Sequence, residues 1–249
     1  GKTQDFRGSI RDKDSQEMLQ HQESLVKTVD YKKQAVEQAR KKIRDGYATT
    51  TNILELADAL FALETEEAQA EAVKVLQDAY AQSKDFTYSK RLGEFRIRKL
   101  KRQMRQVAQQ LRNKGEDPTL RSRLQELSQQ LDETEREHYK KCQQNYPTDL
   151  RFKYEYGRCL LKAQQYDEAI PLFQESQKDA RLKLASMDKM GLCFLLKGWL
   201  EDAVDIFQAA LEHCVNKEGA VAKDIRYNLA RAYESDGQGD KALKIYRKL

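Results

Sequence analysis

Histidine and cysteine are the side chains best suited to chemistry near neutral pH, and they are few and scattered in this chain. The histidines are His21, His138 and His213, and the cysteines are Cys142, Cys159, Cys193 and Cys214. No two cysteines form a C-x-x-C pair, and His213 and Cys214, which are adjacent, would point roughly 100° apart on a helix. The sequence also lacks the glycine-rich phosphate loops, the H-E-x-x-H motif and the G-x-S-x-G motif. We therefore predict no catalytic residues, no metal ligands and no cofactor, and a protein that is not an enzyme.

The composition indicates an all-α protein. Charged residues make up 34% of the 249 residues, whereas there are only 11 glycines and 3 prolines. The abundant residues are strong helix formers, and β-branched runs are nearly absent. A hydrophobic content of 39% suits helices that each bury one stripe. The net charge of +5 does not by itself indicate a nucleic-acid partner.

Membrane and export signals are absent from this sequence. No apolar run approaches the roughly 18 residues that a membrane-spanning helix needs, and the first residues are too polar for a signal peptide. The cysteines at positions that suit core packing favour a reducing compartment. We expect a cytoplasmic protein, unless a signal or anchor preceded Gly1.

A pattern that repeats after 34 residues organises the second half of the chain. The first copy has Gly157, Leu160, Ala169 and Phe173, and the second has Gly191, Phe194, Ala203 and Phe207. A small residue followed three positions later by a large apolar one predicts a first helix with a point of close approach. An alanine and an aromatic residue four apart share one face of a second helix. Gln164, Gln165 and Gly198 fall where the two helices must turn.

This pattern resembles the tetratricopeptide repeat, which has the same residue types on a period of 34. A third copy follows an insertion of five residues near positions 214–220, and it carries Leu229, Ala230, Tyr233, Ala242 and Tyr246. The chain departs from the family in that Lys153, Met187 and Arg226 replace the usual tryptophan. A repeat-ending proline is also missing after the first two copies. The resemblance implies a solenoid of stacked helix pairs, with three repeats in residues 146–249.

In the family, first-helix residues line a groove that holds an extended peptide or a partner helix. Matching the motif places ten residues there: Arg151, Tyr154, Arg158, Lys162, Lys189, Leu192, Leu196, Tyr227, Asn228 and Arg231. Arginine and tyrosine anchor interfaces well, so we expect a protein partner with an acidic segment. The alternative is that these are ordinary solvated positions. A subclass that clamps a C-terminal carboxylate is not supported, because Tyr154 and Arg158 stand where it has lysine and asparagine.

Residues 13–145 are expected to form an N-terminal helical region, preceded by a disordered tail over residues 1–12. A helix from Asp14 or Ser15 to about residue 44 should end at Asp45 and Gly46. Residues 49–83 reproduce the repeat pattern in degenerate form.

An antiparallel coiled-coil hairpin is predicted over about residues 86–145. Two apolar stripes have 4-3-4 spacing: Leu100, Met104, Val107 and Leu111, and then Leu120, Leu124, Leu127 and Leu131. Between them, Asp117 can cap a helix that begins with Pro118. Residues 91–114 hold nine basic residues and one acidic residue, whereas residues 116–137 hold seven acidic and three basic residues. Antiparallel pairing of these arms is therefore electrostatically favourable.

We conclude from the sequence that the chain is a non-catalytic scaffold or adaptor for protein–protein interaction. One alternative is a nucleic-acid-associated protein that uses the basic arm over residues 91–114, although a solvated helix face is the simpler interpretation of that arm. Another is a structural subunit that self-assembles through the hairpin or the C-terminal repeat. Because no polar capping helix follows Tyr246, we also expect either a longer natural protein or a partner that covers Leu243 and Tyr246.

Overall fold

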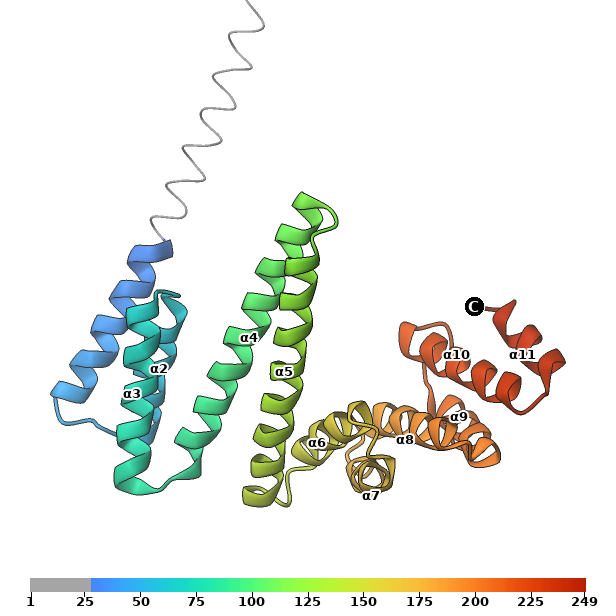
Figure 1. Cartoon of the computed structure of the whole chain (residues 1–249). Coiled ribbons are helices and arrows are strands. Elements are labelled where there is room, and N and C mark those ends of the chain that lie inside the picture. The colour runs from blue at the N-terminus through green and yellow to red at the C-terminus, as the bar shows by residue number, and fades with distance from the viewer. Residues whose placement is uncertain (1–27) are drawn as a thin grey trace, which may run out of the picture. The chain divides into compact units, whose positions relative to one another are not determined.

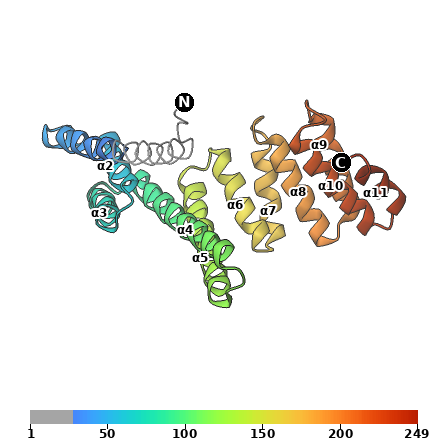
Figure 2. The ribbon, with the colours of Figure 1, turned by 90° about the horizontal axis from the view of Figure 1, so that it is seen from above.

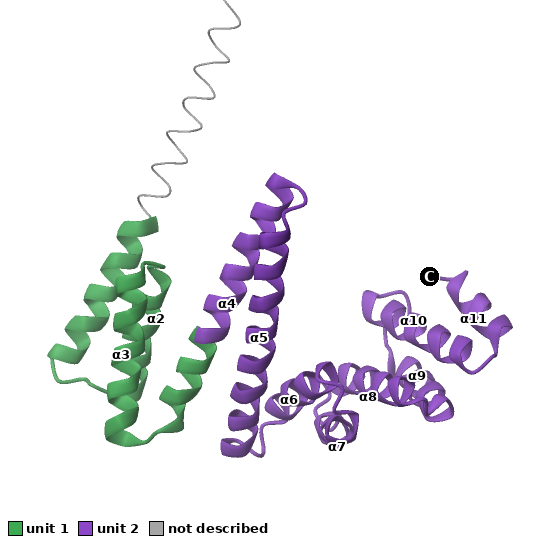
Figure 3. Ribbon diagram, viewed as in Figure 1, with its two compact units in different colours: residues 1–95 green, residues 96–249 purple. Residues whose placement is uncertain are grey.

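The computed structural model describes residues 28–249, so the predicted tail over residues 1–12 and the helix start at Asp14 or Ser15 lie outside the described residues. The described part of the chain is all-α and contains no strand (Figure 1). It divides into two compact units, with the boundary between residues 95 and 96 (Figure 3). Nothing helical between residues 28 and 249 is both long enough and apolar enough to cross a bilayer.

The first unit packs four helical segments around one apolar core. These are residues 28–44, α2 (Thr50–Ala62), α3 (Glu66–Ser83) and the first turns of α4 (Phe86–Lys114). The side chains of Thr49 and Thr65 cap α2 and α3. Phe61 stacks on the buried Phe95 with ring centroids 4.0 Å apart. The two helices over residues 50–83 fit the predicted degenerate repeat, which stays a prediction.

The second unit begins with a helical hairpin. The rest of α4 and α5 (Pro118–Asn145) lie side by side and run in opposite directions (Figures 1 and 2). The turn is built as the sequence predicts, because Asp117 Oδ1 accepts from the backbone N–H groups of Thr119 and Leu120 at 2.9 and 3.2 Å. Leu127 and Leu131 are buried on α5. That the two helices supercoil as a coiled coil stays a prediction.

Six shorter helices follow: α6 (Leu150–Lys162), α7 (Tyr166–Ser176), α8 (Lys183–Lys197), α9 (Leu200–His213), α10 (Ala220–Ser235) and α11 (Gly239–Tyr246). Consecutive helices pack against each other, and first helices of neighbouring pairs also touch (Figure 2). Gln164 and Gly198 adopt positive φ angles of 60° and 78° at the turns expected from the sequence. The five-residue insertion forms the loop between α9 and α10.

The repeated glycines are points where two helices approach closely. A Cβ atom on Gly157 would lie 3.0 Å from Cε1 of Phe173, and one on Gly191 would lie 2.6 Å from Cε1 of Phe207. Both phenylalanines are fully buried. The glycine of the first helix and the phenylalanine of the second therefore recur together because each ring occupies the space that a side chain would need.

Candidate functional site

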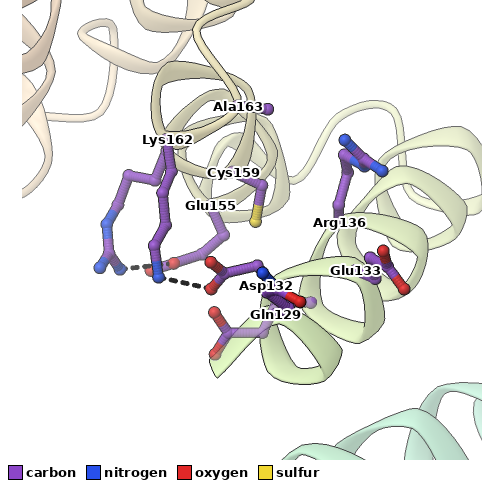
Figure 4. Close-up of a pocket in the computed structure, with 10 residues that line it drawn as sticks. Gln129, Asp132, Glu133, Arg136, Glu155, Cys159, Lys162 and Ala163 are labelled. Atoms are coloured by element: carbon purple, nitrogen blue, oxygen red, sulfur yellow. Dashed lines mark hydrogen bonds and ion pairs between the residues drawn. The ribbon is translucent and has the colours of Figure 1, made fainter. Parts of the chain in front are cut away.

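Two of the predicted site residues, Arg158 and Lys162, lie on a cavity of about 290 Å³ between α5 and α6 (Figure 4). Both project from α6, which starts at its cap residue Asp149. The residues that line the cavity are Gln129, Asp132, Glu133, Glu135, Arg136, Glu155, Arg158, Cys159, Lys162 and Ala163.

Two of the cations around this cavity are paired with carboxylates that also line it. Lys162 Nζ contacts Asp132 Oδ1 across the two helices, and Arg158 Nη1 donates to Glu155 Oε2 at 2.8 Å (Figure 4). The lining has four carboxylates and three cationic side chains, so its net charge is small. Exposed pairs of this kind each contribute at most about 1 kcal/mol. A charged group from another molecule can therefore replace one member at little cost.

Cys159 is the side chain in this cavity that could act as a nucleophile, but its thiol is held protonated. Burial, with the negative charges of Glu135 and Glu155, raises its pKa to about 12. Because the thiolate is the reactive form, this thiol is inert near neutral pH. On α5, His138 Nε2 lies 3.6 Å from Cys142 Sγ, and both side chains are buried. No group of three potential metal ligands occurs in residues 28–249.

A buried carboxylate, Asp188 on α8, joins α8 to α10, which are the first helices of two neighbouring pairs. Its Oδ1 accepts from Nδ2 of Asn228 on α10 at 2.8 Å, and its Oδ2 accepts from Nζ of Lys189 at 2.8 Å. The charges of Asp188 and Lys189 also act on the hydroxyl of Tyr154 on α6, whose pKa is raised mainly by burial. The structure thus brings together the predicted residues Tyr154, Lys189 and Asn228.

Tyr154 links this group to the cavity. Its ring meets the buried Phe173 edge-on with centroids 5.9 Å apart, and the guanidinium of Arg158 lies 6.0 Å from its centroid. The face formed by Tyr154, Arg158 and Lys189 therefore presents an aromatic ring between two cations. We call these three residues, with Tyr227 and Arg231, the first-helix face.

On α10, Tyr227 and Arg231 lie one turn apart and face α11. Tyr227 is 52% exposed, and its ring centroid is 6.0 Å from that of Tyr246. Arg231 forms no ion pair with any residue in the described part of the chain, and its charge acts on the Tyr246 hydroxyl. Both side chains are available to another molecule.

Four of the ten predicted positions have other surroundings. Asn228 is only 8% exposed, and its amide is bonded to Asp188, so the expectation that it faces a partner needs revision. Arg151 folds back onto the cap residue Asp149 through three hydrogen bonds. Leu192 packs against the core of the last repeats. Leu196 is 49% exposed.

Sequence reasoning missed the acidic residues that organise this region. Asp188 positions Lys189 and Asn228, and Asp132 and Glu155 hold Lys162 and Arg158. Asp188 could have been noticed in the sequence, because it is the single carboxylate within the mostly apolar stretch of α8. Nothing local in the sequence marks Asp132, which lies 30 residues from its partner.

Two segments of the chain match a known family of helical repeats. Residues 130–181 and residues 226–249 match the tetratricopeptide repeat. Among solved structures, MamA of AMB-1 is 18% identical with a TM-score of 0.48, covering 77% of this chain and 94% of its own. MamA (41-end) of Desulfovibrio magneticus RS-1 is 16% identical with a TM-score of 0.47, covering 88% and 93%. A search of curated proteins finds no match.

The two matched segments include the end of α5 with α6 and α7, and most of α10 with α11. They contain the first copy of the recurring pattern and most of the third, whereas the second copy, in α8 and α9, lies between them. Proteins of this family are typically non-catalytic scaffolds for protein–protein interaction. The chain thus contains tetratricopeptide repeats in residues 130–181 and 226–249.

Proposed function

We propose that this protein is an adaptor that holds an acidic segment of a partner protein along the first-helix face. The observation that carries the proposal is the arrangement around Asp188. The buried carboxylate of Asp188 bonds α8 to α10 through Asn228 and also holds Lys189. The guanidinium of Arg158 lies over the ring of Tyr154 on the neighbouring first helix, α6. A rigid base with tyrosine and cationic groups on top has the composition of an interface anchor.

The charges favour an acidic partner. Arg231 has no ion partner among residues 28–249, and Lys189 uses one of its three N–H donors on Asp188. Arg158 is exposed and is held by the partly buried carboxylate of Glu155, so a partner's carboxylate can replace this pairing at modest cost. An Asp- or Glu-rich segment that reaches all three cations would gain charge-assisted hydrogen bonds without leaving a buried group unpaired.

Site-specific photo-crosslinking tests this proposal. A benzophenone amino acid replaces Tyr227, which is 52% exposed, and in a second protein it replaces Val215, which is 99% exposed in the α9–α10 loop. Both are mixed with nuclease-treated lysate of the source cells, and the crosslinked peptides are sequenced by mass spectrometry. We expect one recurrent acidic peptide at position 227 and none in common at position 215.

Charge reversal then identifies the surface. Arg158→Glu with Arg231→Glu should reduce the crosslink yield at least tenfold, because each cation becomes a repulsive carboxylate. The matched control reverses Lys140 and Lys244, which are exposed on α5 and α11. Equal yields from both double variants, or a crosslinked peptide without acidic residues, would show that the first-helix face does not bind as proposed.

A further inference from the structure

The basic residues of α4 are arranged as a stripe. Between residues 96 and 114 the helix has eight basic residues and no acidic residue. Arg98, Arg102, Arg105 and Arg112 follow one another at steps of 4, 3 and 7 residues, which places them on one face. From Arg98 to Arg112 the stripe is about 21 Å long at 1.5 Å per residue.

This arginine stripe points away from the partner helix of the hairpin. The apolar residues that pack towards α5 are Leu100, Met104, Val107 and Leu111, all partly buried. At about 100° per residue, the centre of the stripe lies roughly 140° around the helix from this apolar seam. Lys101 lies on the flank between them and reaches Glu135 on α5 at 2.6 Å. The acidic arm therefore lies on the far side of α4 from Arg98, Arg105 and Arg112.

Three arginines of the stripe make no bond that would have to be broken for binding. Arg98, Arg105 and Arg112 are exposed, and they form no ion pair or side-chain hydrogen bond with any residue from 28 to 249. Arginine presents a planar fork of donors that matches phosphate and carboxylate groups. Guanidinium groups that follow one face of a helix match an anionic partner whose charges are also regularly spaced along a line.

The surroundings of the stripe distinguish between kinds of anionic partner. Between residues 81 and 195 no large apolar side chain is exposed. The hairpin thus has no apolar anchor for a membrane surface and no exposed ring on which single-stranded bases could stack. It also lacks the apolar centre that protein–protein interfaces normally bury. Binding by charge alone, without base or apolar contacts, is how proteins hold the backbone of a double helix.

We propose that the arginine stripe of α4 binds the phosphate backbone of duplex nucleic acid without sequence specificity. The stripe runs along the duplex and contacts about one phosphate per arginine. Neutralising four phosphates gives a slope of log K against log[salt] of about −3.6. Affinity should therefore fall roughly 150-fold between 50 and 200 mM salt. This interaction is independent of the partner segment proposed for the first-helix face.

The test uses the purified full chain and fluorescein-labelled 20-base-pair duplexes of DNA and of RNA, each in two unrelated sequences. Binding is followed by fluorescence anisotropy from 50 to 200 mM salt. Arg98→Gln/Arg105→Gln/Arg112→Gln removes three charges from the stripe, and glutamine keeps the helix propensity. The matched control, Arg123→Gln/Lys140→Gln/Lys141→Gln, removes three charges from α5. Circular dichroism verifies that both variants are folded.

We expect wild type and the α5 variant to bind both sequences of a duplex equally, with the steep salt dependence given above. The stripe variant should bind more weakly, and its slope should be shallower by about 2.7, so that the same salt increase costs it only a few-fold in affinity. No duplex binding at 50 mM salt, or equal loss in the two variants, would overturn the proposal. So would stripe-dependent binding of phosphatidylserine vesicles or polyglutamate in place of the duplexes.

Discussion

Replacing Gly191 by alanine tests whether the repeat depends on close contact between its two helices. The new Cβ would lie 2.6 Å from Cε1 and 2.8 Å from Cζ of Phe207, and 2.8 Å from Cγ2 of Ile206. Phe207 is fully buried, so its ring cannot swing away. Overpacking of this kind costs about 1–3 kcal/mol, whereas alanine gains about 1 kcal/mol over glycine within a helix. All three contacts are shorter than 3.0 Å, which places the cost in the upper part of that range, so we expect a net destabilisation of about 1–2 kcal/mol.

The equivalent change at Gly157 is the matched control. There the nearest ring atom of Phe173 lies 3.0 Å from the new Cβ, so a shift of a few tenths of an ångström suffices. Strain and helix propensity then nearly cancel, and Gly157→Ala should change stability by less than about 1 kcal/mol.

Trp199 provides the assay. It is the only tryptophan in the chain, it lies between α8 and α9, and it stacks on Phe194 with centroids 5.9 Å apart. Its fluorescence during urea titration therefore reports unfolding of the repeat that contains Gly191. A double-mutant cycle with Phe207→Leu isolates the contact, because the smaller side chain should remove most of the penalty. If Gly191→Ala is as stable as wild type, or its cost persists unchanged beside Leu at position 207, the close-approach argument is wrong.

Three further predictions concern buried groups and a cap. Ser176→Ala should cost about 1–3 kcal/mol in urea titrations, because it strands the buried hydroxyl of Ser186, 2.8 Å away, and the double alanine variant should recover much of this loss. Burial raises the pKa values of Cys159 and Cys193 from 9.0 to about 12, so the folded chain keeps protons that the unfolded chain releases. Stability should fall as pH rises above about 9, by about 1.4 kcal/mol per pH unit and thiol, and less steeply in Cys159→Ala/Cys193→Ala. Asp117→Ala removes the cap of α5 and should lower stability by about 0.5–2 kcal/mol in thermal melts, whereas Asp117→Asn should change it little.

Local patterns in the sequence predict much of this fold because each has a local physical cause. The glycine and phenylalanine of a repeat recur together since one fills the space beside the other. The turn at Asp117 and Pro118 follows from capping chemistry, and Gly198 stands at a turn with a φ of 78°. These features depend on neighbours within one helix pair, and the spacing of residue types records such neighbours directly.

The contacts between neighbouring helix pairs were not predictable in the same way. Asn228 matched a groove position by its place in the motif, but a modest rotation of α10 decides whether its amide meets solvent or Asp188, 40 residues earlier. The ion pairing between the hairpin arms could not be predicted from their summed charges either. Summing the charges of residues 91–114 and 116–137 predicts attraction, but it ignores the direction of each side chain. Lys101 lies near the seam and pairs with Glu135, whereas Arg105 points away from α5.

The stacking of the repeats combines apolar packing with a few buried polar contacts. Ser176 of α7 meets Ser186 of α8, and Asp188 of α8 meets Asn228 of α10. Apolar surfaces gain nearly the same burial over a range of helix rotations, but a polar group that loses its partner on burial is costly. These contacts therefore penalise rotations that the apolar core would tolerate. Because Asp188 also holds Lys189, the contact that fixes α10 against α8 fixes a cation of the first-helix face as well. A partner that pulls Lys189 away would weaken the junction beneath it, so binding and repeat stacking should be coupled.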